Sequence, residues 1–155
     1  MNGRHNVHAT GIVLGRTGVM LRGPSGAGKS LLALALLDQW EARGRAARLV
    51  ADDRIELEPT ARGLVMHAPP AIAGLIELRG RGIVKRPFTP RARLHLVVDL
   101  VETLDRMVEE DELQTEVLGQ RLARCPAPRW GIGELAHQCL LVGEAIRALS
   151  PGRAG

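Results

Sequence analysis

A glycine-rich stretch near the N-terminus constrains this chain more than any other part of its sequence. It reads Gly23-Pro24-Ser25-Gly26-Ala27-Gly28-Lys29-Ser30 and matches the P-loop pattern G-x-x-x-x-G-K-[ST]. The glycines let the backbone wrap a polyphosphate with its N–H groups pointing inward, and a helix that follows presents its N-terminus to the same anion. Lys29 is expected to neutralise the β- and γ-phosphates of ATP, and Ser30 to place a hydroxyl on Mg²⁺.

The lysine in this motif strengthens the match. Only two of the 21 basic residues of the chain are lysines, Lys29 and Lys85. A chain of this composition is expected to contain roughly 0.0015 such matches by chance. A short apolar strand before the motif and an apolar helix after it complete the context that a phosphate-binding loop requires.

The size and composition of the chain are those of one globular domain. With 155 residues, 45% apolar and 25% charged, we expect a single domain over residues 1–150 and a frayed tail over 151–155. No apolar run approaches the roughly 18–20 residues that span a bilayer, and the N-terminus does not resemble a secretory signal. The sequence therefore predicts a cytoplasmic protein without a membrane partner.

The net charge of +4 raises the question of nucleic acid binding. The arginines are scattered, however, and with one Phe and no Tyr the chain has few rings on which bases could stack. We therefore expect no nucleic acid partner, and a charge that suits phosphates or an acidic protein. Cys125 and Cys139 lack the spacing of a metal site and are expected to be free thiols.

Alternating strand and helix patterns predict an α/β fold with a mixed β-sheet and flanking helices. The strands are expected at residues 7–14, 18–22, 47–51, 55–58, 64–67, 75–78 and 94–100, with 55–58 and 64–67 as an antiparallel pair. Helices are expected at 31–42 and 109–122, with a loop at 125–131. A closing helix is expected to bury the face formed by Leu135, Cys139, Val142, Ile146 and Leu149.

Two carboxylates end the strand at 47–51. Asp52 and Asp53 lie where a Mg²⁺ ligand or a base is expected beside a phosphate loop. Adjacent side chains on a strand point to opposite faces, so the two should differ in role. The alternative is a solvated turn that begins the next hairpin. Taken alone, His8 and Glu77 are weaker candidates, since each also fits an exposed structural residue.

Four blocks together resemble the catalytic domain of bacterial HPr kinase/phosphorylase, in a short form found in some proteobacteria. They are His8 followed by two strands, the P-loop, Leu49-Val50-Ala51-Asp52-Asp53, and Leu75-Ile76-Glu77-Leu78-Arg79-Gly80-Arg81-Gly82-Ile83. The last block is similar to the family's I-E-I-R-G-x-G-I stretch, which discriminates far better than a P-loop. The resemblance implies a fold like the nucleotide-binding part of phosphoenolpyruvate carboxykinase.

The resemblance also implies roles for individual residues. Lys29 and Ser30 would hold the phosphates and Mg²⁺, and Glu77 would be a further Mg²⁺ ligand beside Asp52. Asp53 would accept the proton of the acceptor serine, and His8 would help to orient Asp53. Arg106, in Leu104-Asp105-Arg106-Met107, is similar to the arginine of the family's D-R-L-G motif and would be catalytic.

The implied activity is ATP- and Mg²⁺-dependent serine phosphorylation of the phosphocarrier HPr or an HPr-like protein, by a homo-oligomer that is a hexamer in the family. The family's V-R-P-G-R-N loop is replaced here by Ala127-Pro128-Arg129-Trp130-Gly131-Ile132. This leaves phosphorolytic dephosphorylation open. Two alternatives remain at this point, a small-molecule P-loop kinase and a non-catalytic ATP sensor.

Overall fold

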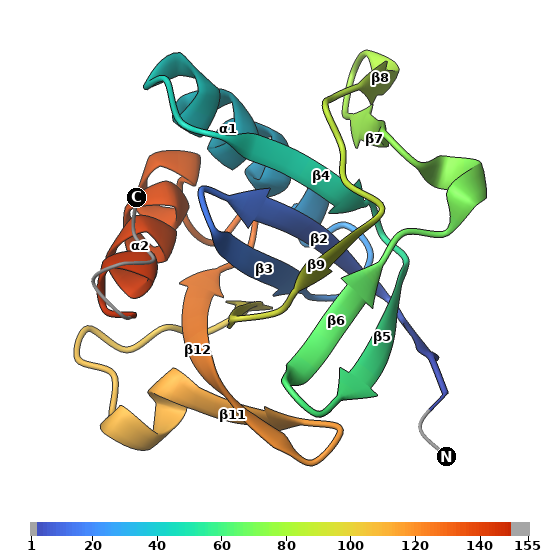
Figure 1. The fold of residues 1–155 in the computed structure, drawn as a ribbon. Coiled ribbons are helices and arrows are strands. Elements are labelled where there is room, and N and C mark those ends of the chain that lie inside the picture. The colour runs from blue at the N-terminus through green and yellow to red at the C-terminus, as the bar shows by residue number, and fades with distance from the viewer. Residues whose placement is uncertain (1–2, 150–155) are drawn as a thin grey trace.

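A six-stranded mixed sheet lies at the centre of the computed structural model, which describes residues 3–149 (Figure 1). The tail expected at 151–155 lies outside the described residues. The strand order is β11 (Gln114–Val117), β12 (Gln120–Pro128), β10 (Leu96–Val101), β3 (Thr17–Arg22), β2 (Ala9–Leu14) and β4 (Ala47–Ala51). β12, β10 and β3 are parallel to one another, whereas the remaining pairs are antiparallel. The predicted α/β class with a mixed sheet is confirmed.

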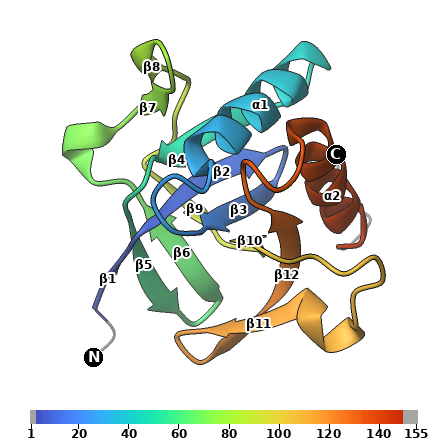
Figure 2. The same ribbon diagram turned by 180° about the vertical axis from the view of Figure 1, so that it is seen from behind.

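Two helices, α1 (Lys29–Ala42) and α2 (Leu135–Arg147), cover one face of this sheet (Figures 1 and 2). The helix predicted at 31–42 is confirmed and begins two residues earlier. Its apolar residues are buried around most of its circumference, as its sequence predicted. On α2 the buried residues include Cys139, Val142 and Ile146, three members of the predicted face.

A second sheet packs on the opposite face of the central one. Its strands are antiparallel in the order β1 (His5–Val7), β5 (Ile55–Thr60), β6 (Gly63–His67) and β9 (Arg91–Arg93). Side chains of the central strands alternate between the two faces of the sheet. On β3, Val19 and Leu21 face the helices while Met20 faces the second sheet. The two sheets approach each other closely at Gly18 of β3, where any Cβ would collide with the carbonyl oxygen of Arg93 on β9.

A hairpin of β7 (Leu75–Leu78) and β8 (Gly82–Lys85) projects beside α1 (Figures 1 and 2). A short 3-10 helix, η1 (Pro70–Ile72), precedes it. Ile76 is fully buried in the core beneath α1 and anchors the hairpin there. The strand at 75–78 was predicted, whereas β8 and β9 were not.

Three sequence predictions are corrected. The segment 109–122 is not a helix, because only a short 3-10 helix, η2 (Glu110–Leu113), forms before the β11–β12 hairpin. Residues 125–128, expected in a loop, belong to β12. Leu118 and Gly119 form the turn between β11 and β12, and both have positive φ angles, 48° and 78°, as a two-residue hairpin turn requires. The strand predicted at 7–14 divides at His8, where the chain passes from the second sheet to the central one.

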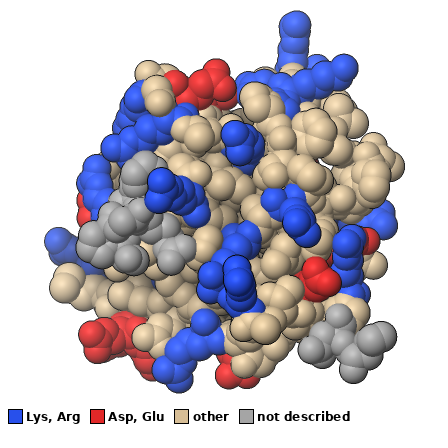
Figure 3. All heavy atoms as spheres, in the orientation of Figure 1, with Lys and Arg blue, Asp and Glu red and all other residues tan. Residues whose placement is uncertain are grey.

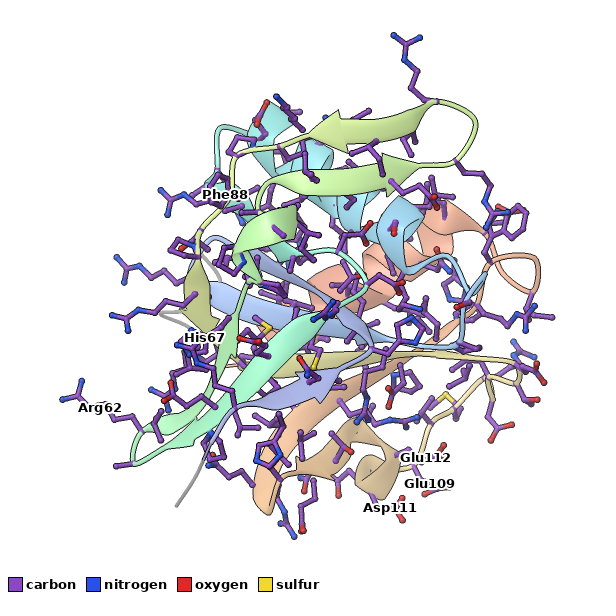
Figure 4. All side chains as sticks on the ribbon, turned by 90° about the vertical axis from the view of Figure 1, so that its right-hand side faces the viewer. Arg62, His67, Phe88, Glu109, Asp111 and Glu112 are labelled. Atoms are coloured by element: carbon purple, nitrogen blue, oxygen red, sulfur yellow. The ribbon has the colours of Figure 1, made fainter. Side chains whose placement is uncertain are left out.

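Charged side chains are spread over the surface. Figure 3 shows Lys and Arg side chains distributed over one whole face, with uncharged surface between them. Figure 4 shows Glu109, Asp111 and Glu112 at η2, and Arg62 pointing outward at the far end of the second sheet. Within residues 3–149 no helix has the length and apolarity needed to cross a membrane.

Both cysteines are free, as predicted. Burial raises the pKa of the Cys125 thiol to about 12, and burial also raises the pKa of Cys139. Thiolate is the reactive form of cysteine, so burial disfavours the reactive form of both side chains.

A cluster of charged residues links β3, the strand that leads into the glycine-rich loop, to β10 and β12. Asp99 on β10 accepts hydrogen bonds from Arg22 Nε (2.7 Å), Arg22 Nη2 (2.9 Å) and Arg124 Nε (2.6 Å). Burial alone would raise the pKa of Asp99, but the hydrogen bonds and positive charges of the two arginines outweigh it, and the pKa lies below its ordinary value.

Replacing Asp99 by Asn should lower the free energy of unfolding at pH 7 by about 3 kcal/mol, because two half-buried arginines lose their counter-charge. The native pKa is the lower one, so the stabilisation is fully present above a pH of about 4 and is lost as the pH falls through the native value. Urea unfolding of wild type and Asp99→Asn should therefore converge at acidic pH. A difference in the free energy of unfolding between wild type and Asp99→Asn that is the same at pH 7 and at acidic pH would contradict this role. So would an equal loss of stability in the control Asp105→Asn.

Candidate active site

The glycine-rich loop of residues 23–30 connects β3 to α1, and Lys29 is the first residue of the helix. Gly26 and Gly28 have φ angles of 83° and 93°, a region that residues with a side chain rarely adopt. Within the described chain no side chain caps the start of α1. The backbone N–H groups of the first helical turn are therefore available to an anion.

Lys29 is held inside the loop. Its side chain is only 5% exposed, and Nζ donates to the carbonyl oxygens of Gly23 (2.7 Å) and Pro24 (3.2 Å). Nζ also lies 3.6 Å from Oδ1 of Asp53. The ammonium group is thus fixed at the edge of the loop, between the expected phosphate position and a carboxylate.

Asp52 joins three separate elements through its carboxylate. Oδ1 accepts hydrogen bonds from the hydroxyls of Ser30 (2.6 Å) and Thr10 (3.0 Å), and Oδ2 accepts one from the backbone N–H of Glu77 (3.0 Å). Because Ser30 donates its proton to Asp52, the lone pairs of its oxygen stay free for a cation.

Asp53 follows β4 in an unusual backbone conformation. Its φ angle is 63°, and its N–H donates to the Thr10 hydroxyl at 3.0 Å. Its side chain is 57% exposed, and its Oδ1 lies 2.5 Å from Nε2 of His8. A non-glycine residue held in this region costs energy, and such residues cluster at functional sites. The carboxylates of the two aspartates therefore have different partners, and both residues follow the strand instead of ending it.

These groups surround one cavity of about 340 Å³. The glycine-rich loop forms one wall, the two aspartates a second, and the β7–β8 hairpin a third. The hairpin contributes Glu77, Arg79 and Ile83, and the loop after β12 contributes Trp130. The structure thus brings together the predicted residues Lys29, Ser30, Asp52, Asp53 and Glu77 around the cavity, and His8 joins them through Asp53.

The oxygen ligands of this cavity suit a hard cation. Ser30 offers a hydroxyl, and Asp52 and Glu77 offer carboxylates, which are the ligand types that Mg²⁺ prefers. Residues 3–149 contain no cluster of three or more His, Cys, Asp or Glu side chains that could hold a metal alone. Mg²⁺ commonly binds through one or two carboxylates, with water and substrate phosphates as its other ligands, so these residues fit it.

Arg106 is the predicted site residue that the structure places elsewhere. It lines a separate cavity of about 880 Å³, between β12, α2 and the segment 104–113. It is not among the residues that surround the cavity at the glycine-rich loop. The catalytic role that the resemblance implied for Arg106 stays a prediction.

Sequence reasoning missed Thr10 and Trp130. Thr10 is fully buried, and its hydroxyl both accepts from Asp53 and donates to Asp52. The backbone N–H of Trp130 donates to the carbonyl oxygen of Ala27 at 2.9 Å, and the centroid of its ring lies 4.5 Å from the guanidinium carbon of Arg79. The scarcity of tryptophan in the chain was the one available signal for the second residue.

Comparison with known proteins matches residues 1–132 to the family model "HPr Serine kinase C-terminal domain". The chain belongs to this family. Within it, the chain is similar to HPr kinase/phosphorylase of Bordetella pertussis, with 39% identity over 92 residues, and of Geobacillus thermodenitrificans, with 34% identity over 131 residues. These alignments cover 54% and 79% of this chain but 28% and 40% of the two relatives, so the chain spans less than half of their length.

The family assignment agrees with a solved structure. The HPr(Ser) kinase/phosphatase of Coxiella burnetii matches with a TM-score of 0.72 and 28% identity, over 92% of this chain and 88% of that one. The resemblance inferred from the four sequence blocks is thereby confirmed at the level of the family.

Thr10→Val tests the hydroxyl that links the two aspartates. Valine has nearly the same shape but cannot bond Asp52 or the N–H of Asp53, so we expect the free energy of unfolding to fall by about 1–3 kcal/mol. Thr103→Val, at an exposed position, should change it by less than about 0.5 kcal/mol. Chemical denaturation measures both. Equal stabilities of Thr10→Val and wild type would show that the hydroxyl does not hold Asp53.

Proposed function

We propose that this chain is a protein serine kinase, which transfers the γ-phosphoryl group of ATP to a serine hydroxyl of HPr or an HPr-like carrier protein with Mg²⁺ as cofactor. The observation that carries the proposal is the exposed Asp53 carboxylate, positioned between His8 and Lys29 at the edge of the glycine-rich loop. The relatives named HPr kinase/phosphorylase support the same chemistry and the same class of acceptor.

The chain's own groups suit the binding of the nucleotide and the cation. The N–H groups of the glycine-rich loop and Lys29 would hold the phosphates, as in a P-loop. Ser30, Asp52 and Glu77 would hold Mg²⁺. Bound there, ATP supplies the phosphoryl group and Mg²⁺ neutralises charge on the phosphate oxygens.

Asp53 would act on the acceptor serine. As the serine oxygen becomes the nucleophile, its proton passes to the Asp53 carboxylate. His8 orients that carboxylate through the contact of its Nε2 with Oδ1, and the Thr10 hydroxyl holds the backbone of Asp53. In the reverse direction, protonated Asp53 would return the proton to the serine oxygen.

The exposure of these groups favours a protein acceptor. The side chains of His8 and Asp53 are 50% and 57% exposed, so a serine on a protein surface can reach them. A small-molecule kinase normally encloses its acceptor and excludes water. A pure ATP sensor does not require a carboxylate held in a strained conformation beside the phosphate-binding lysine. We further propose a single catalytic domain over residues 1–150 and assembly as a homo-oligomer.

Lys29→Ala should abolish transfer of labelled phosphate from ATP to purified HPr or HPr-like carriers, because the loop loses its cation and the hydrogen bonds to Gly23 and Pro24. Lys85→Ala is the matched control, since it removes the only other lysine, which does not line the cavity. The control should retain transfer. If the wild-type protein with Mg²⁺ labels no such carrier but consumes ATP with sugars or nucleosides, the acceptor assignment is wrong.

Asp53→Asn should lower the rate of transfer about 10²- to 10⁴-fold, the usual contribution of a general base, and leave ATP affinity within a few-fold of wild type. Transfer kinetics and calorimetric ATP titration measure the two effects separately. Asp111→Asn, an exposed aspartate outside this cavity and outside the cavity that Arg106 lines, serves as the control. A loss of ATP affinity as large as the loss of rate would instead assign Asp53 to metal binding.

A further inference from the structure

A tryptophan and an arginine form a stacked pair in the wall of the cavity. The guanidinium carbon of Arg79, after β7, lies 4.5 Å from the ring centroid of Trp130, after β12. These residues are 51 positions apart in the sequence and meet only at the cavity. None of the roles derived above for phosphate, cation or acceptor uses either of them.

Trp130 has a defined position relative to the phosphate-binding loop. Its backbone N–H donates to the carbonyl oxygen of Ala27 at 2.9 Å, and its Cβ lies so close to Gly28 that a side chain there would collide with it. Hydrogen bonds from Ile132 and Gly133 to the carbonyl oxygen of Arg129 fold the segment into a tight turn. Trp130 nevertheless remains 45% exposed.

Arg79 is available for a ligand. Its side chain is exposed, and among residues 3–149 it makes no ion pair with a carboxylate. Ile83, which is 64% exposed, adds an apolar surface to the same cavity. Guanidinium planes and aromatic rings both stack on planar aromatic ligands.

Aromatic residues are otherwise scarce near the site. The chain has two Trp, one Phe and no Tyr. Trp40 is 5% exposed and belongs to the core, and Phe88 lies against Gly74 beside β4, outside the cavity lining (Figure 4). A half-exposed tryptophan beside a triphosphate-binding loop is therefore a specific feature of this surface.

We infer that Trp130, Arg79 and Ile83 form the subsite for the nucleobase. The base of ATP stacks against the layer of indole and guanidinium, while its triphosphate lies along the loop of residues 23–30. This inference rests on the proposed function, because it places the phosphates of ATP in that loop. Stacking of a base on an aromatic side chain contributes enough affinity to be measured by a single substitution.

The test is calorimetric titration of wild type, Trp130→Ala and Trp130→Phe with ATP and with inorganic tripolyphosphate, each with Mg²⁺. Trp130→Ala should weaken ATP binding about 10-fold or more, the usual effect of losing one base–aromatic stack. Tripolyphosphate lacks a base, so its affinity should change less than about 2-fold, and Trp130→Phe should retain most of the ATP affinity. Leu140→Ala, an exposed apolar position on α2, is the control.

A second measurement uses the wild-type protein alone. Acrylamide quenches exposed indoles, so its effect reports Trp130 far more than the buried Trp40. ATP should protect the fluorescence from acrylamide, whereas tripolyphosphate should not. Unchanged ATP affinity in Trp130→Ala, equal losses for both ligands, or equal protection by both would overturn the base subsite. Absence of any ATP binding to wild type would instead overturn the proposed function, and the subsite with it.

Discussion

The carboxylate of Asp52 is the interaction on which the arrangement of the site depends. It receives hydrogen bonds from the central sheet through Thr10, from α1 through Ser30 and from the β7–β8 hairpin through the backbone of Glu77. Hydrogen bonds to a charged acceptor are stronger than neutral ones. The sheet, α1 and the hairpin therefore share one fixed point, and the backbone of Asp53 is held through the same Thr10 hydroxyl.

Much of the fold could be predicted because its elements carry local signals. The strands at 47–51 and 75–78 are short apolar runs, and α1 is apolar on most sides, so pattern alone locates them. The segment 109–122 carries no such signal, since β11 and the first three residues of β12 are exposed or partly exposed and mostly polar. They are strands because β12 pairs with β10, a contact between distant parts of the chain that no local pattern contains.

The site shows the same division. Lys29, Ser30 and Asp53 could be predicted because a motif or the end of a strand marks them, and the structure places them together. Thr10 can contact the two aspartates only because β2 lies beside β4. Trp130 reaches the cavity only because the chain returns to the glycine-rich loop after β12. Tertiary contacts create these two roles, so the amino-acid types at those positions could not indicate them.

His8 lies where the chain leaves β1 in the second sheet and enters β2 in the central one. Its imidazole can reach Asp53 only when β1 is paired with β5, that is, when the two sheets are packed together. A partly unfolded molecule with a detached second sheet could retain its helices and its glycine-rich loop. Under the proposed mechanism, such a molecule would bind nucleotide but lack the contact that orients the Asp53 carboxylate, so packing of the small sheet would be needed for transfer and not for binding.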